Sequence, residues 1–275
     1  MRTINCKGKL IDLSTPKVMG ILNITPDSFY DGGKYEKEQD ILEHVDKMIT
    51  EGATFIDVGG YSSRPGAKHI SEEEELERVV PVIEMIQKHF PDSIMSIDTF
   101  RSNVAKAGIQ AGAAIVNDIS AGQLDEDMLP TVGKLNVPYI MMHMRGTPQT
   151  MKEHTNYKDL VHDVNMYFSE RINNARYYGV KDIILDPGFG FSKNLGQNFE
   201  LLNKLELLTM AGLPLLVGVS RKSMIFKLLD QSQNEALNGT TSLNTVALMK
   251  GASILRVHDV KEAMECVMLY NQLNA

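Results

Sequence analysis

The chain has 275 residues, 43% of them hydrophobic, which is enough for one large α/β barrel or two small domains. Its formal net charge of −7 comes without a basic stripe, which argues against a nucleic-acid binder. The first residues lack the apolar segment of a secretory signal, and no run approaches the roughly 18 apolar residues that cross a bilayer. Cys6 and Cys266 lack metal-type spacing. We therefore expect a cytoplasmic protein with reduced thiols and with neither a membrane nor a nucleic-acid partner.

Eight short apolar, β-branched runs recur along the chain, each followed by polar residues, with helical patterns between the runs. They cover residues 17–23, 54–60, 94–99, 114–120, 138–143, 182–188, 215–220 and 253–258. Eight such strands predict an α/β fold with a single (β/α)8 barrel, and a doubly wound open sheet is the alternative. Since no linker or low-complexity stretch divides the chain, we expect residues 1–275 to form one domain.

The segments between the runs carry helix signals. Ser71 and Glu74 have capping-box spacing, and the glutamates after Ser71 are expected to form a solvated face. Pro81 is expected to kink or divide this helix. A second helix is expected to end at Gly179, with its methionines and tyrosines in the core, and a third lies within residues 236–250.

Polar side chains lie near the carboxyl ends of seven of the eight runs. Taken singly, each has a structural interpretation, because a strand-end aspartate often caps the next helix. Since an unpaired buried polar group costs about 1–3 kcal/mol, seven strands converging on one rim indicate a site at the carboxyl ends of a barrel. The residues concerned are Asn23, Asp57, Asp98, Asn117 with Asp118, His143, Asp186, and Arg256 with His258.

These residues divide into two chemical sets. Asp98, Asn117 and Asp186 are short acceptors on three strands, which suits a flat heterocycle with adjacent N–H donors, such as a 2-amino-4-oxo pyrimidine ring. A second set suits an anion such as a diphosphate, because arginine matches phosphate oxygens and an amide oxygen is a ligand for Mg²⁺. This set is Arg64, Arg256 and His258 with Asn23, and Lys222 fits either set.

Several catalytic motifs are missing from the sequence. There is no HExxH, no Cys–His cluster and no GxSxG, and the glycine-rich stretch 187–193 lacks Walker spacing. The serines at strand ends and in loops, Ser28, Ser62, Ser63 and Ser220, have no evident His–Asp partners. A heterocycle, a diphosphate and Mg²⁺ without a protein nucleophile predict displacement of the diphosphate by a second substrate.

Seven motifs closely resemble those of dihydropteroate synthase, in family order from residue 20 to about residue 260. They are GILNITPDSFYDGG (20–33), DVGGYSSRPGA (57–67), SIDTFRSNVA (96–105), IVNDISAG (115–122), LDPGFGFSKN (185–194), GVSRKSMI (218–225) and RVHDV (256–260). The resemblance implies a folate-pathway transferase with a (β/α)8 barrel, usually a homodimer, that requires Mg²⁺ and is inhibited competitively by sulfonamides. Such an enzyme condenses (7,8-dihydropterin-6-yl)methyl diphosphate with p-aminobenzoate to give 7,8-dihydropteroate and diphosphate.

The resemblance also implies roles for individual residues. Pterin-binding positions are Asp98, Asn117, Asp186 and Lys222. Diphosphate-binding positions are Asn23, Ser63, Arg64, Arg256 and His258, with Asn23 also at the metal. The p-aminobenzoate pocket is formed by Ser63, Arg64, Pro65, Phe191, Lys222 and Ser223. Catalytic roles fall to Arg64, Lys222, Arg256 and His258.

The loop at 59–66 departs from the usual family pattern. Tyr61 replaces an acidic residue and Ser63 replaces a threonine, which keeps the hydroxyl. We expect the loop to close over the site once the diphosphate and Mg²⁺ are bound, with Arg64 paired to the anion. Two alternatives are a methyltetrahydrofolate–corrinoid methyltransferase domain, which would not need the anion set, and a catalytically silent paralogue, which would have lost it.

Overall fold

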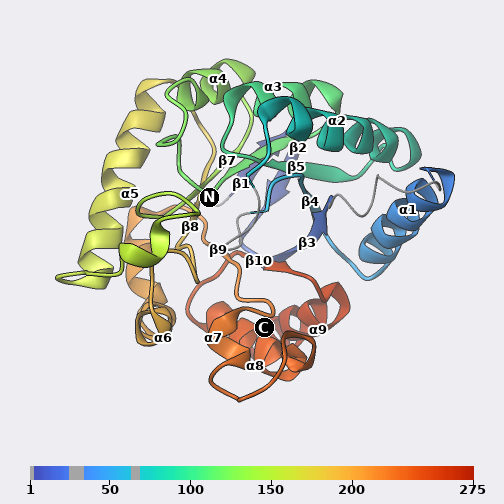
Figure 1. Ribbon diagram of the computed structural model, residues 1–275. Coiled ribbons are helices and arrows are strands. Elements are labelled where there is room, and N and C mark those ends of the chain that lie inside the picture. The colour runs from blue at the N-terminus through green and yellow to red at the C-terminus, as the bar shows by residue number, and fades with distance from the viewer. Residues whose placement is uncertain (1–2, 25–33, 63–68) are drawn as a thin grey trace.

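The computed structural model describes residues 3–24, 34–62 and 69–275, apart from the side chains of residues 34–37. Eight parallel strands lie at the centre of the molecule (Figure 1): β3 (Lys17–Asn23), β4 (Phe55–Gly59), β5 (Ile94–Asp98), β6 (Ile115–Asp118), β7 (Tyr139–Met142), β8 (Ile183–Asp186), β9 (Leu216–Val217) and β10 (Ile254–Val257). They pair in the order β8-β7-β6-β5-β4-β3-β10-β9, and a parallel bridge between Leu185 and Leu215 joins the two edges. The predicted barrel is confirmed, and the alternative of an open sheet is wrong.

Helices surround the strands, as Figure 1 shows in a view along the barrel axis. Most of them follow a strand and return the chain to the start of the next one, which is the right-handed βα pattern of this fold. They are α1 (Lys34–Thr50), α2 (Glu72–His89), α3 (Ser102–Ala111), α4 (Met128–Leu135), α5 (Leu160–Tyr177), α6 (Leu195–Asn203), α7 (Ser223–Phe226), α8 (Leu237–Met249) and α9 (Val260–Leu273). Among the described residues no helix is long and apolar enough to cross a membrane.

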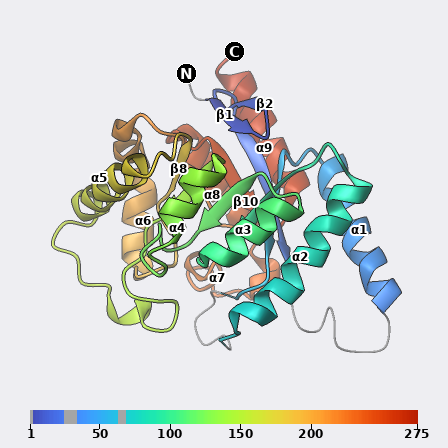
Figure 2. The same cartoon turned by 90° about the horizontal axis from the view of Figure 1, so that it is seen from above.

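A β-hairpin that the sequence analysis did not predict precedes the barrel. It consists of β1 (Thr3–Cys6) and β2 (Lys9–Asp12), which pair antiparallel. Lys7 and Gly8 connect them with φ of 53° and 87°, the two left-handed conformations that a type I′ turn requires. Figure 2 shows the hairpin at one end of the barrel, the end at which both chain termini lie.

The hairpin packs on a layer of side chains inside the barrel. Each strand contributes one buried residue near its start: Met19, Phe55, Ile94, Ile115, Ile140, Ile184, Leu216 and Ile254. The hairpin adds Ile4, Cys6, Ile11 and Leu13 to the same cluster. Because this cluster fills the amino ends of the strands, the interior is left open to polar groups only at the carboxyl ends.

Helix α2 begins at the predicted cap, but the rest of the helix differs from the expectation. Ser71 Oγ accepts a hydrogen bond from the backbone N–H of Glu74, as predicted. The helix runs through Pro81 without division, so that alternative is wrong. Glu75 is fully buried and pairs with Arg101, Nη1 to Oε2 at 2.6 Å, so the glutamates do not all face solvent. The cation of the following β5–α3 connection makes this burial possible.

Candidate active site at the mouth of the barrel

Polar side chains from adjacent strands meet at the carboxyl ends, as the sequence predicted. In the strand register Asn23 is opposite Gly59, Gly59 is opposite Asp98, and Asp98 is opposite Asn117, so one row crosses β3 to β6. Asp186 ends β8 on the far side of the barrel. Parallel strands place these ends on one rim, which we call the mouth of the barrel.

Asp57 in β4 is the centre of a buried hydrogen-bond network below the mouth. Its carboxylate is fully buried and accepts hydrogen bonds from Ser96 Oγ, from Asn117 Nδ2 at 3.0 Å and from Arg256 Nε at 2.6 Å. A buried carboxylate is tolerable when several donors and a cation satisfy it. Asp57 therefore fixes the position of an amide and a guanidinium that the sequence assigned to two different ligand sets.

Arg256 joins Asp57 to Asp98. Its Nη2 donates to Asp98 Oδ2 at 2.7 Å. Burial raises the pKa of Asp98 to about 7, the charge of Asp57 adds to the rise, and Arg256 opposes it. Burial lowers the pKa of Arg256, but the charges of Asp57 and Asp98 raise it by more. The two sets separated by the sequence analysis are thus contiguous.

The shifted carboxylate at Asp98 predicts a pH-dependent stability. Its pKa is about 7 in the folded protein and close to 3.9 in an unfolded chain, so the native state binds the extra proton between these values. Free energy of unfolding should therefore fall as pH rises from about 4 to about 7. We expect Asp98→Asn to flatten this fall, measured by urea denaturation at several pH values without ligand. Burial also raises the pKa values of Asp118 and Asp186, which leave a residual slope of the same sign, so equal slopes in both proteins would contradict the prediction.

Lys222 and Asp186 face the same space. Burial lowers the pKa of Lys222 to about 8, and the charge of Asp186 opposes this shift. Burial raises the pKa of Asp186, and the charge of Lys222 opposes that shift in turn. The Lys222 ammonium donates to the carbonyl oxygen of Phe189 and lies 5.0 Å from the centre of the Phe191 ring.

Arg221, which the sequence analysis did not single out, holds the backbone next to Lys222. It has a left-handed φ of 52°, and its backbone N–H donates to Thr240 Oγ1 at 3.0 Å. Its guanidinium binds both carboxylate oxygens of Asp259 at 2.8 Å. This two-point attachment is the geometry for which arginine is suited. Ser223 follows as the exposed first residue of α7.

Ser220 has a histidine partner, contrary to the expectation from sequence. Its Oγ lies 3.0 Å from His258 Nδ1 and accepts a hydrogen bond from the His258 backbone N–H at 3.2 Å. The carboxylate that follows His258, Asp259, pairs with Arg221. Ser220 therefore orients His258 at the end of β10, and the arrangement differs from a Ser–His–Asp triad.

Two other polar residues near strand ends are engaged within the protein. Asp118 accepts hydrogen bonds from Tyr139 Oη at 2.6 Å and from the Ser120 backbone N–H at 2.7 Å, which makes it a structural acceptor. Arg145 pairs with Asp163, Nη2 to Oδ2 at 2.9 Å. Asp118, which the sequence analysis grouped with the mouth, and Arg145 therefore both have partners within the protein.

The loop at 59–66, which follows β4 and is called the second loop below, is described only at its edges. Three predicted site residues lie outside the described residues: Ser63, Arg64 and Pro65. On the edge of this segment Tyr61 Oη lies 3.2 Å from His69 Nδ1 and accepts a hydrogen bond from Gln149 Nε2 at 2.8 Å. Where the resemblance expects an acid, this chain thus has an aromatic hydroxyl that links both flanks of the loop to the segment after β7.

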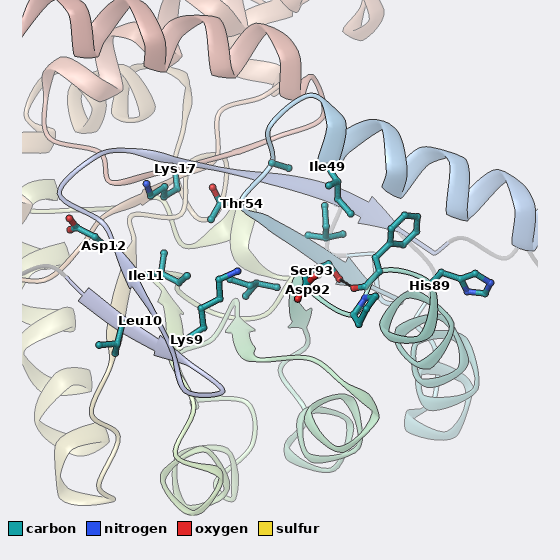
Figure 3. A pocket seen from close by; sticks show the side chains of 15 residues that line it. Lys9, Leu10, Ile11, Asp12, Lys17, Ile49, Thr54, His89, Asp92 and Ser93 are labelled. Carbon is teal, nitrogen blue, oxygen red and sulfur yellow. Dashed lines mark hydrogen bonds between the residues drawn. The ribbon is translucent and has the colours of Figure 1, made fainter.

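A separate cavity of about 640 Å³ lies at the opposite end of the barrel (Figure 3). Figure 3 shows Lys9 of β2 and Lys17 at the start of β3 on one side, and Asp92 and Ser93 of the α2–β5 turn on the other. The starts of the strands form this region, and the buried layer with Phe55 separates it from the mouth. The cavity therefore takes no part in the network around Asp57.

Comparison with known proteins gives consistent similarities. The family described as "Pterin binding enzyme" matches residues 19–258. The dihydropteroate synthase of Escherichia coli (strain K12) is 46% identical over 263 residues, covering 95% of this chain and 93% of that one. A Yersinia pestis dihydropteroate synthase, in a sulfonamide drug complex, is 43% identical with a TM-score of 0.92 and 99% coverage of both chains. A Xanthomonas albilineans dihydropteroate synthase, with 4-aminobenzoic acid, is 36% identical with a TM-score of 0.91, covering 99% of this chain and 98% of that one.

Proposed function

Since the chain belongs to the dihydropteroate synthases of the pterin-binding enzyme family, we propose that the mouth of its barrel holds both substrates of that reaction in contact. The enzyme is a transferase of folate biosynthesis that condenses (7,8-dihydropterin-6-yl)methyl diphosphate with p-aminobenzoate to give 7,8-dihydropteroate and diphosphate. The observation that carries the assignment to the mouth is Arg256, a cation beside the carboxylates of Asp57 and Asp98 at the level where the strands end.

The pterin ring is proposed to lie among Asp98, Asn117, Asp186 and Lys222. The carboxylates can accept from the N–H groups of the ring, and Lys222 can donate to a ring acceptor. The hydrogen bond from Asn117 to Asp57 leaves the amide oxygen of Asn117 as an acceptor of fixed orientation. The residues are therefore preorganised before substrate binds, which lowers the ordering cost of binding.

The leaving diphosphate is proposed to lie against Arg256, His258 and Asn23, with Ser63 and Arg64 from the second loop. The C–O bond to the diphosphate breaks first, with its electron pair on oxygen, which leaves a cation stabilised by the pterin ring. The arylamine lone pair then forms the C–N bond, and the amine loses a proton. Cations placed where negative charge develops are a large source of rate acceleration, and exclusion of water protects the pterin cation. These residues act electrostatically, so no strong base is required.

Mg²⁺ is proposed as the metal of this site. Among the described residues no group of three or more histidine, cysteine, aspartate or glutamate side chains is placed to hold a metal ion. Asn23, with its side chain exposed at the end of β3, can offer one amide oxygen. That donor set fits Mg²⁺, which usually keeps several waters and binds through substrate phosphates rather than a full protein cage. When bound, the ion would neutralise charge on the diphosphate.

The p-aminobenzoate pocket is proposed to include Phe191, Lys222 and Ser223, with Ser63, Arg64 and Pro65. The Phe191 ring packs on a buried cluster that contains Met142 and lies beside the Lys222 ammonium. A sulfonamide shares the aromatic amine of p-aminobenzoate, and the Yersinia pestis relative is described in complex with such a drug. We therefore propose sulfonamides as competitive inhibitors of this chain.

A homodimer is proposed on the basis of exposed apolar residues on α8 and α9. The side chains are Val246, Met249, Met268, Leu269 and Leu273, with exposed fractions between 37% and 79%. Such a surface suits a second copy of the chain.

We also propose a cytoplasmic location and a single domain over residues 1–275. We propose that the partners include neither nucleic acids nor membranes, and the net charge of −7 supports this proposal.

A product assay tests the proposal. Purified protein is mixed with the dihydropterin methyl diphosphate and p-aminobenzoate, with Mg²⁺ or with a chelator, and dihydropteroate is followed by mass spectrometry. We expect product with Mg²⁺ and its loss with the chelator. Absence of product in Mg²⁺, with pterin binding still measurable by calorimetry, would contradict the transferase reaction and favour a silent paralogue.

A further inference from the structure

Lys193 is a buried lysine whose three hydrogen-bond acceptors all lack a full negative charge. Lys193 is 7% exposed. Its Nζ lies 2.9 Å from His143 Nδ1, 3.0 Å from the carbonyl oxygen of Gly188 and 3.0 Å from that of Phe191. An ammonium has three protons, so each acceptor can take one. Lysine normally keeps its charged end in water, and burial lowers the pKa of Lys193 well below its usual value, although the charge of Asp186 opposes this shift. Stability alone therefore does not explain why a lysine occupies this buried position.

The three acceptors connect two separate segments of the chain. His143 follows β7, whereas Gly188 and Phe191 belong to the turn between β8 and α6. The backbone N–H of Phe191 donates to Gly188 O at 3.1 Å, so Lys193 binds both ends of a closed turn. Gly188 has a φ of 70°, and a Cβ there would lie 2.1 Å from His143 O, which shows how closely the turn approaches β7.

The turn held in this way carries two groups that face the mouth. The Phe191 ring lies beside the Lys222 ammonium, and the Phe189 carbonyl oxygen accepts a hydrogen bond from that ammonium. A displacement of the turn would therefore move Phe191 and remove the acceptor that orients Lys222. Phe191 and Lys222 both belong to the proposed p-aminobenzoate pocket.

We infer that Lys193 and His143 form a positioning pair that sets the place of the Phe191 turn and thereby the affinity for the arylamine substrate. The inference rests on the proposed function, since it uses Phe191 as a wall of the p-aminobenzoate pocket. Neither residue touches the reacting atoms. The pterin ring is proposed to contact side chains of β5, β6 and β8 besides Lys222, so we expect its affinity to depend less on the turn than the affinity for the arylamine does.

The protonation of His143 agrees with this arrangement. Burial lowers the pKa of His143 well below its usual value, and the charge of Lys193 adds to the shift. The neutral imidazole can accept at Nδ1, which the contact with an ammonium requires. The ring also packs on Tyr167, with centroids 4.8 Å apart, so His143 combines a polar contact with a packing contact.

Two substitutions of His143 separate these contacts. His143→Asn keeps an acceptor near the place of Nδ1 but loses the ring, whereas His143→Leu keeps apolar bulk but removes the acceptor. Lys193→Met removes all three donors at similar length, and Lys204→Met, at an exposed lysine paired with Glu200, is the matched control. Steady-state KM for p-aminobenzoate, kcat, thermal midpoint and pterin affinity by calorimetry are measured for each.

We expect Lys193→Met and His143→Leu to raise KM for p-aminobenzoate by about tenfold or more, and to change pterin affinity and kcat, which also depend on Lys222, by a smaller factor. His143→Asn should raise KM by less than about threefold although it lowers the thermal midpoint. An order of KM values that follows the thermal midpoints, or an unchanged KM in Lys193→Met, would overturn the inference. Should Lys193→Met fail to fold, the two His143 variants decide. A wild-type protein that neither forms product nor binds p-aminobenzoate would overturn the proposed function together with this inference, whereas an active wild type with unchanged variants overturns the inference alone.

Discussion

Lys222→Met is expected to lower kcat/KM for dihydropteroate formation by about 10²–10³-fold, equivalent to about 3–4 kcal/mol. The substitution removes the cation that opposes the upward pKa shift of Asp186, and it removes the donor to Phe189 O. Asp186 would then be protonated more readily and accept less well from the pterin ring. Truncating one member of a buried charge pair also leaves the other uncompensated.

Initial rates with each substrate varied in turn measure this effect. The matched control is Lys227→Met, because Lys227 is exposed at the end of the same short helix. We expect the control to stay close to wild type. A loss of less than about threefold in Lys222→Met, in a protein with an ordinary thermal midpoint, would remove Lys222 from the site.

The second large effect concerns the pair of Asp57 and Arg256. Asp57→Ala is expected to lower the free energy of unfolding by about 3–5 kcal/mol, because a guanidinium with only 20% of its side chain exposed loses a partner at 2.6 Å. It should also weaken pterin binding, since Asn117 loses the acceptor that orients its amide.

A double-mutant cycle separates the pair from its surroundings. Arg256→Met combined with Asp57→Ala should be less destabilising than the sum of the single changes by about 1–3 kcal/mol, because neither Asp57 nor Arg256 is then left without the other and only Asp98 loses its cation. Urea denaturation gives the stabilities and calorimetry the pterin affinities. Asp118→Asn serves as a comparison, since Asp118 is also buried but binds Tyr139, and it should lose stability without a matching loss of pterin affinity. Additive single changes would show that the ion pair does not hold the network.

The fold was predictable because each barrel strand is buried on both faces and is therefore written as a continuous apolar run. All eight runs overlap an observed strand: the run 17–23 coincides with β3, and the other seven strands are shorter than their runs. The β1–β2 hairpin was missed because it alternates instead, with Ile4 and Cys6 buried and their neighbours facing outward. Lys7-Gly8 was the signal that could have revealed it.

The side chains of the site were predictable as types and as strand ends, but their partners were not. Arg256 binds carboxylates that lie 199 and 158 residues earlier in the chain, and no local pattern indicates which of several rim carboxylates it will choose. Helix α5 shows the same limit in its tyrosines. Tyr167 is partly buried and donates to Met142 O, as a core position allows. Met166, Tyr177 and Tyr178 are 57%, 84% and 45% exposed, so the expectation of a core position was wrong for these three.

The hairpin across the amino ends of the strands has a consequence for how this enzyme can change over time. A substitution at the mouth that alters ligand choice will often lower the free energy of unfolding, because the buried groups around Asp57 depend on one another for their hydrogen bonds. The cluster formed by Ile4, Ile11 and the starts of the strands lies at the other end of the barrel, and its members include none of the residues proposed to bind ligands. Distant sites contribute additively to stability. Better packing there can therefore compensate for losses at the mouth, so that drug-resistant or redesigned variants can be recovered by changes remote from the substrates.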